Sequence, residues 1–431
     1  MKEKVKKILK NEFLLNILTV FSGNTISQIL PLLFYPIITR IYEPSEFALI
    51  SLFTATALIF GNISTMQYHK AIMVAEDDSE ATNVLALSFI CIIVVTTVTT
   101  IVIIVFNQFI VDLMANDYMS IWLYLVPLTV FFTGMTNTLN MWASRQKEFK
   151  RLAVEKVANK SSSSIGKIGI GYLQYTNAGL ILGSLIGQFV SNLYLVVLTF
   201  KDQINFKTIS VQKVKKLMYK YRHFPIYSNL SKSGGAIKET TVKYVISNFF
   251  GASILGAYSF TYGILMQPLS LIGNAVSHVY FQKISELFHQ KKDIWPIQRK
   301  IILYLSLIGF IALLPVYFFG EELFRLIFGE KWVEAGTFAS LMTPWLFAIF
   351  ISSPLLSLNY VLNKQKQYMC ISVGVNLLFP LVLIISSLLI TNFNSVLIII
   401  SWAGFIINMF WIVWVRKYSL QYQADKSGIS Y

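Results

Sequence analysis

Cysteine, histidine and charged side chains are all scarce in this sequence of 431 residues. The two cysteines, Cys91 and Cys370, lie far apart within hydrophobic stretches, so the sequence offers no CxxC motif for zinc or redox chemistry. The four histidines show no metal-ligand spacing, and no glycine-rich phosphate loop is present. The longest hydrophilic segment, Lys201–Arg222, is too short for a catalytic domain. We therefore expect neither an enzyme nor a protein with a resident metal or cofactor.

Hydrophobic residues make up 55% of the chain and charged residues only 13%, with a mean hydropathy of +0.61. These values lie outside the usual range of soluble proteins. Apolar stretches long enough to cross a hydrocarbon core about 30 Å thick recur along the chain. We expect an all-α polytopic membrane protein with about 12 transmembrane helices. The predicted spans are Phe13–Ile38, Phe47–Tyr68, Ala81–Val111, Tyr118–Ser144, Val157–Leu173, Ala178–Phe200, Phe224–Phe250, Ser253–Phe281, Ile301–Gly320, Ala335–Leu362, Gln367–Ile390 and Ser395–Val415.

Basic residues predict the orientation of these spans. With both termini in the cytoplasm, nearly all Lys and Arg residues outside the spans fall on the cytoplasmic side, and only Arg40, Arg325 and Lys331 fall outside. We expect a multi-pass protein of the inner (cytoplasmic) membrane. The net charge of +15 then reflects this bias and attraction to anionic membrane lipid, and it needs no nucleic-acid partner. The largest outer segment, Glu321–Glu334, is expected to be an interfacial helix with Trp332 at the headgroup level.

The two halves of the chain share sequence features. Arg145–Phe149 (RQKEF) and Lys364–Tyr368 (KQKQY) occupy corresponding loops, and Pro127 corresponds to Pro344. Six predicted spans in each half make this a parallel repeat about an axis along the membrane normal. We expect two six-helix bundles related by a parallel pseudo-two-fold axis. The N-terminal bundle is predicted at residues 1–200, a basic cytoplasmic linker at 201–222 and the C-terminal bundle at 223–431.

Five lysines interrupt the predicted spans, namely Lys160, Lys167, Lys232, Lys238 and Lys243. A charge at the centre of a bilayer costs about 2.5–3.5 kcal/mol even on the most lenient scale. These lysines must therefore face water, one another or an anion. Snorkelling to the membrane interface is the alternative, most plausibly for Lys160 and Lys243, which lie nearest the ends of their helices. We interpret the set as a cationic, substrate-binding interior.

Glu239 is the single acid within the predicted spans and is therefore the candidate for coupling transport to H⁺ or Na⁺. Its spacing from Lys243 also suits an ion pair within one helix, which would make its role structural. Polar residues of the first span, Asn24 and Gln28, are further substrate-binding candidates, as is Asn159.

The chain resembles polysaccharide repeat-unit flippases of the O-antigen and capsule type (Wzx-like), within the superfamily that includes multidrug and toxic-compound extruders. The residues that carry the resemblance are Pro31–Phe53, Tyr68–Ala81, Arg145–Ala153, His223–Asn229, Phe249–Gly273 and Leu323–Phe338. Where relatives commonly have Arg-Tyr-Glu at the end of the second span, this chain has Gln67-Tyr68-His69. No role is carried over to those positions.

The resemblance implies a substrate and a mechanism. The cargo would be undecaprenyl-diphosphate carrying an oligosaccharide repeat unit, moved from the cytoplasmic to the outer leaflet by alternating access, as in lipopolysaccharide O-antigen biosynthesis. A polysaccharide polymerase and a chain-length regulator would be partner proteins. A MATE-like small-molecule exporter stays an alternative, although cationic drugs call for buried acids. A polysaccharide polymerase is a second alternative, but it would normally need a large outer loop. A peptidoglycan-precursor flippase of the same superfamily is the third, and it would be expected to have two more helices than the sequence predicts.

Overall fold

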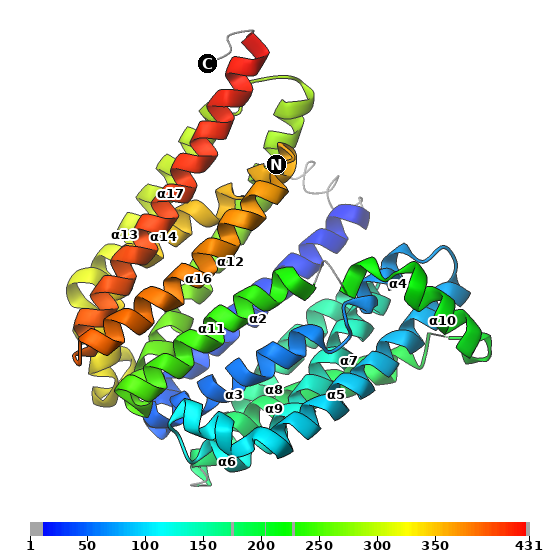
Figure 1. Ribbon diagram of the computed structural model, residues 1–431, viewed down its shortest axis with the longest axis horizontal. Coiled ribbons are helices and arrows are strands. Elements are labelled where there is room, and N and C mark those ends of the chain that lie inside the picture. The colour runs from blue at the N-terminus through cyan, green and yellow to red at the C-terminus, as the bar shows by residue number, and fades with distance from the viewer. Residues whose placement is uncertain (1–11, 174–175, 203, 226–228, 428–431) are drawn as a thin grey trace, which may run out of the picture. The chain divides into compact units, whose positions relative to one another are not determined.

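The computed structural model describes residues 12–173, 176–202, 204–225 and 229–427, and their regular secondary structure is helical throughout. The chain forms two compact units, Met1–Ser253 and Ile254–Tyr431, which are considered separately below (Figure 1). The helices of the first unit are α2 (Glu12–Ile41), α3 (Pro44–Ile63), α4 (Ala71–Val74), α5 (Asp78–Met114), α6 (Met119–Trp122), α7 (Val126–Arg145), α8 (Phe149–Tyr172), α9 (Thr176–Thr199), α10 (Val211–Lys220) and α11 (Asn229–Phe250). Those that follow are α12 (Ala252–His289), α13 (Trp295–Phe328), α14 (Val333–Leu355), α15 (Leu358–Val361), α16 (Gln365–Leu389) and α17 (Phe393–Ser427).

Each predicted span coincides with one of the longer helices, which confirms the all-α, multi-pass architecture. Within the described residues, 8 segments are long and apolar enough to cross a membrane. Helices α2, α8, α11 and α12 are not among these segments, and the side chains at the start of α2 and of α11 lie outside the described residues. Three of these four, α2, α8 and α11, carry the predicted substrate-binding residues. The lysines of α8 and α11 make these two helices poorly suited to contact lipid on all sides, so both are best placed along a polar interior.

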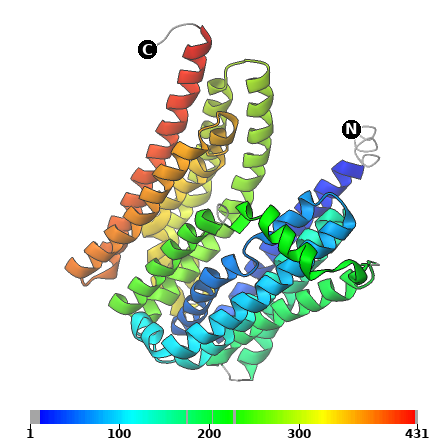
Figure 2. The same cartoon turned by 45° about the vertical axis from the view of Figure 1, so that its right-hand side comes forward.

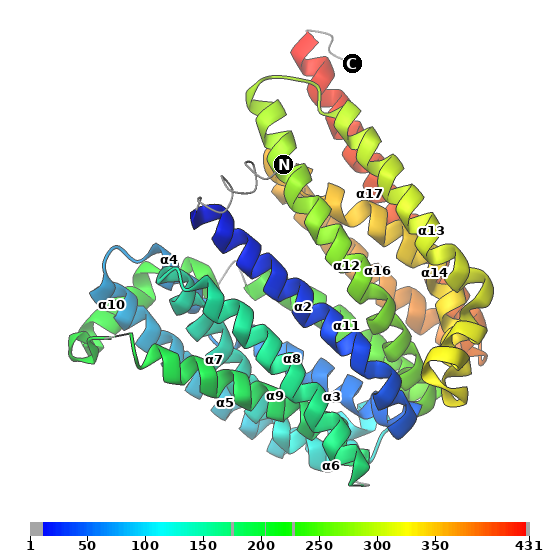
Figure 3. The same ribbon diagram turned by 180° about the vertical axis from the view of Figure 1, so that it is seen from behind.

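Close packing of α8 against α9 and α2 organises part of the first unit (Figure 3). Gly179, Gly183 and Gly187 form a small-residue stripe with a four-residue repeat along α9. A Cβ atom added at Gly183 would lie 2.5 Å from the backbone nitrogen of Lys167, and one added at Gly187 would lie 2.5 Å from the carbonyl oxygen of Asn159. Because these glycines have no side chain, the backbones of α8 and α9 can approach closely. Close packing of this kind favours helix association in lipid, where the burial of apolar side chains contributes little.

Helix α11 packs within the first unit rather than the second. Its main neighbours are α3 and α5. Thr240 donates a hydrogen bond to the carbonyl oxygen of Ala55 at 3.0 Å, and Ser247 donates one to that of Met114. The structural division therefore falls at residue 253, whereas the sequence predicts that the second bundle begins at residue 223. The two divisions differ by this helix, and the pseudo-two-fold relation stays a prediction.

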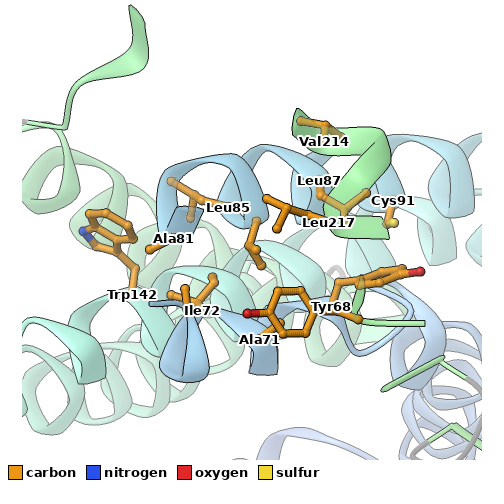
Figure 4. Close-up of a cluster of buried hydrophobic side chains, with 13 residues drawn as sticks. Tyr68, Ala71, Ile72, Ala81, Leu85, Leu87, Cys91, Trp142, Val214 and Leu217 are labelled. Carbon is orange, nitrogen blue, oxygen red and sulfur yellow. The ribbon is translucent and has the colours of Figure 1, made fainter. Parts of the chain in front are cut away.

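A hydrophobic cluster holds the linker helix α10 on α5 (Figure 4). Val214 and Leu217 of α10 contribute its apolar face, and Trp142 and Tyr68 contribute the large rings. The Tyr68 hydroxyl donates a hydrogen bond to the carbonyl oxygen of Met218 at 3.0 Å. The segment predicted as a basic cytoplasmic linker is therefore an ordered, amphipathic part of the first unit.

The polar side of α10 carries an ion-pair cluster. Lys220 donates hydrogen bonds to Glu76 and Glu80, each at 2.7 Å. These two bonds raise the pKa of Lys220. The neighbouring Lys215 and Lys216 are exposed on the same helix. This arrangement leaves basic side chains at the surface, as expected of a helix beside anionic lipid.

Long antiparallel helices build the second unit, in which α14 packs against α13 and α17 (Figure 2). Trp332, between α13 and α14, is 0% exposed, and its ring centroid lies 4.4 Å from that of Phe260 in α12. The indole of Trp332 is therefore enclosed by protein, and its position at the headgroup level stays a prediction. Residues Glu321–Phe328 instead continue α13 after a local break in helical geometry at Phe319, so the indole completes an aromatic core with Phe324 and Phe328.

Candidate functional site

The lysines of α8 form the first part of the candidate site. Lys160 and Lys167 are seven residues apart on one continuous helix, which places them on the same face two turns apart. Lys160 is exposed and Lys167 is half-buried. Among the residues that the structure describes, neither ammonium makes a hydrogen bond or an ion pair. Two cations without partners on a helix of membrane-spanning length are suited to bind an anion.

Contacts with α9 and with the end of α2 fix the position of Lys167. The buried Tyr42 hydroxyl donates a hydrogen bond to the carbonyl oxygen of Lys167 at 2.6 Å. Gly183 lets the Lys167 backbone and the start of its side chain approach α9 directly. The lysine therefore projects from a tightly held backbone, so binding of an anion would have to order only its side chain.

Asn24 of α2 lies against a lysine that sequence reasoning assigned to a cytoplasmic loop. The Lys156 ammonium donates a hydrogen bond to Asn24 Oδ1 at 2.6 Å. The predicted span began at residue 157, but α8 begins at Phe149, so Lys156 belongs to the same helix as Lys160. The low hydropathy of residues 149–156 hid this extension, and no side-chain cap marks the start of α8. Gln28, the other candidate in α2, is half-buried.

A second residue missed from the sequence is Glu155, whose side chain is 3% exposed. Asn140 of α7 donates a hydrogen bond to Glu155 Oε2 at 3.4 Å. Glu239 is therefore not the only carboxylate within the membrane-length helices, as the sequence reading assumed. Asn159 lies one turn further along α8 and donates a hydrogen bond to Ser191 of α9 at 3.0 Å. Amide, hydroxyl and charged groups from three helices thus meet in the first unit.

An ion pair lies at one end of this polar region. Arg151 forms a bidentate pair with Asp202, with both N–O distances 2.7 Å. Trp142 donates its indole N–H to the same carboxylate at 3.2 Å. A polar cavity of about 400 Å³ lies beside them, lined among others by Asp78, Gln146, Trp142 and Asp202. The cavity therefore borders the carboxylate that holds Arg151 of α8.

The lysines of α11 have different partners. Lys243 and Glu239 form an ion pair at 2.8 Å within the helix, and the Glu239 side chain is 50% exposed. Lys238 is half-buried. Helix α11 is held by a hydrogen bond between Tyr244 and Thr56 of α3 at 2.8 Å. The lysine groups of α8 and α11 are thus positioned by separate helix contacts. Lys232 belongs to α11, but its side chain lies outside the described part of the chain.

Replacing Glu239 with glutamine should leave export nearly unchanged, within about two-fold, because an exposed i,i+4 pair contributes only about 0.3–0.5 kcal/mol. Transport would be measured in proteoliposomes with and without a pH gradient. If the variant instead lost its dependence on the gradient, the coupling role predicted from the sequence would be assigned to Glu239.

The chain matches the family of polysaccharide biosynthesis proteins over residues 37–337. It belongs to this family. A curated relative from Klebsiella pneumoniae, described as an uncharacterized membrane protein in the cps region, is 23% identical over 311 residues. The match covers 69% of this chain and 60% of the relative, so the chain spans less than two thirds of that protein's length. The family match confirms the resemblance stated from the sequence.

Solved transporter structures share the fold. The lipid II flippase MurJ in an inward closed conformation matches with a TM-score of 0.71 at 12% identity, covering 96% of this chain and 90% of that structure. A multidrug resistance MATE family transporter of the MOP superfamily, in an inward-facing conformation, matches with a TM-score of 0.68 at 12% identity, covering 94% and 95%. At such identities the likeness establishes the fold of this polysaccharide biosynthesis protein, and its substrate must be argued from the site.

Proposed function

We propose that this protein flips undecaprenyl-diphosphate-linked oligosaccharide repeat units from the cytoplasmic to the outer leaflet of the inner membrane. The observation that carries the proposal is the pair of unpartnered lysines, Lys160 and Lys167, on a helix of membrane-spanning length. An ammonium in such a helix is stable only beside water or an anion. A diphosphate offers several charged oxygens, each able to accept charge-assisted hydrogen bonds from lysine.

The membership of a polysaccharide biosynthesis family supports a sugar-bearing cargo. The fold shared with a lipid II flippase and with MATE transporters supports transport by alternating access. In the proposed cycle the glycan and the diphosphate occupy a polar, cationic interior while the polyprenyl chain stays in lipid. Lys232, Lys238 and Lys243 of α11, together with Asn24 and Gln28 of α2, complete the proposed substrate-binding set. Both termini are placed in the cytoplasm by the distribution of basic residues.

The proposal is tested by extracting undecaprenyl-linked saccharides from cells that lack the protein and analysing them by mass spectrometry. We expect one complete repeat unit on undecaprenyl-diphosphate to accumulate in the cytoplasmic leaflet. Restoring the gene should return the pool to its normal level, which controls for effects on neighbouring genes.

Other outcomes would contradict the flippase. A repeat unit that reaches the outer leaflet but stays unpolymerised would identify a polysaccharide polymerase. An unchanged lipid pool would favour a MATE-like exporter of small molecules, the class to which one of the structural neighbours belongs.

A further inference from the structure

Glu155 is a buried carboxyl group that the substrate-binding scheme does not use. Its side chain is 3% exposed, in the first unit, where α8 packs on α7, α9 and α2. Burial away from water disfavours the charged form of a carboxyl group, whereas nearby cations favour it. The groups around Glu155 therefore decide whether it holds a proton.

Two of the charged neighbours of Glu155 are lysines of its own helix. Lys156 and Lys160 attract the carboxylate electrostatically, and Lys156 is held by Asn24 of α2. Among the described residues, Glu155 forms no ion pair with either ammonium. The positive charges of the two lysines thus stabilise the carboxylate, although neither lysine forms an ion pair with it.

The helices packed against Glu155 supply uncharged groups. From α7, Asn140 donates the long 3.4 Å hydrogen bond, and from α9, Ser191 interacts with the carboxylate. The titratable side chain of Tyr194 in α9 interacts electrostatically with Arg151. The oxygens Asn140 Oδ1 and Gln188 Oε1 are buried without a hydrogen-bond partner in the described part of the chain. Buried polar oxygens of this kind call for water or another donor.

A polar cavity is linked to α8 by the ion pair of Arg151 and Asp202. Arg151 lies one helical turn before Glu155 on α8, and its partner Asp202, which follows α9, lines the polar cavity of about 400 Å³. Trp142, two residues after Asn140 on α7, lines the same cavity. The ion pair of Arg151 and Asp202 therefore links the helical turn before Glu155 to this cavity.

We infer that Glu155 is a proton-binding site that takes up one proton when an anionic diphosphate binds to the lysines of α8 and releases it when the anion leaves. An anion on Lys160 offsets the charge that stabilises the carboxylate, so the carboxylate oxygen takes a proton from cytoplasmic water and becomes a carboxylic acid. By linkage, diphosphate binds more tightly as the pH falls. This inference rests on the proposed function, because it names the ion exchanged at the same site.

The test measures proton uptake when undecaprenyl diphosphate, used as the probe, is added to the purified protein in a weakly buffered solution containing a pH indicator. Binding is followed in parallel by tryptophan fluorescence. We expect the wild type to take up roughly one additional proton per diphosphate compared with Glu155→Gln, and the difference cancels protonation of the diphosphate itself. In the pH range over which Glu155 changes its protonation state, the affinity of the wild type for diphosphate should rise by up to about tenfold per unit fall in pH. The affinity of Glu155→Gln for diphosphate should rise less over the same range.

Three further variants make the result specific. Glu155→Asp keeps an ionisable group and should retain proton uptake with a shifted midpoint, which also shows that a change at this position is tolerated by the fold. Glu148→Gln, at the half-exposed start of the same helix, should behave as the wild type. Lys160→Ala should weaken the coupling between diphosphate and proton.

Each outcome has a distinct meaning. Equal proton uptake by the wild type and Glu155→Gln, with diphosphate binding intact, would overturn the assignment of Glu155 and leave the flippase proposal standing. Absence of diphosphate binding in the folded wild type would overturn the proposed substrate itself, and the inference with it.

Discussion

Replacing both Lys160 and Lys167 with alanine should abolish export of the lipid-linked repeat unit. A hydrogen bond to a charged group contributes about 1.5–3 kcal/mol, so the loss of two should weaken diphosphate binding by roughly 100-fold or more. Neither ammonium makes a hydrogen bond or an ion pair among the described residues, and Lys156 still attracts the buried Glu155 when both lysines are replaced. The readout is the surface polysaccharide in complemented cells, together with undecaprenyl diphosphate binding by the purified variant.

Two variants separate charge from position in this experiment. Arginine at both positions should preserve export, because the charge is kept at the same place on α8. Alanine at Lys215 and Lys216, which are exposed on α10 outside the predicted spans, should leave export close to normal. Normal export by the double alanine variant of α8 would refute the cationic site.

Replacing Gly183 with leucine should destabilise the first unit and displace Lys167. A Cβ atom at this position would lie 2.5 Å from the Lys167 nitrogen and 2.6 Å from its Cγ atom, so α8 and α9 must separate. Overpacking at such a contact typically costs 1–3 kcal/mol, and here we expect about 3 kcal/mol or more because a backbone atom is in the way. Thermal unfolding in detergent should begin at lower temperature, and diphosphate binding should be lost.

Gly169→Leu is the matched control for this glycine. It lies in α8, two residues from Lys167, and an added Cβ atom there meets nothing within 4 Å. We expect unfolding and binding close to those of the wild type. Equal stability of the two leucine variants would show that close approach of α8 and α9 is not required.

The helices could be predicted from the sequence because each membrane-spanning segment must by itself be long and apolar enough for the bilayer. In lipid every backbone group is hydrogen-bonded within its own segment, so length and hydropathy locate a span without knowledge of its neighbours. Hydropathy also revealed the lysines of α8 and α11, because a charged residue stands out in an otherwise apolar segment. It failed at Glu155 and Lys156, because the polar first turns of α8 look like a loop when hydropathy alone is considered.

The packing partners could not be predicted in this way. Trp332 lies in a short segment predicted to be outside the membrane, where tryptophan is typical of an interfacial anchor. In the structure its ring instead packs in an aromatic core beside Phe260. Helix α11 follows the basic linker and would be expected to start the second bundle, yet it packs on α3. Both outcomes depend on which side chains are complementary in shape, which a one-dimensional pattern does not contain.

The amino-acid sequence by itself determined that this protein crosses the membrane many times, that it does so as helices, and that some of those helices carry cations that lipid cannot accommodate. These properties follow from transfer free energies that act on each segment separately. Only the tertiary structure decided which cations lack partners, that Lys156 is held by Asn24, and that a carboxyl group is buried beside them. Those properties depend on distances between helices, which are set by the glycine stripe of α9 and by the packing of side chains from several segments at once.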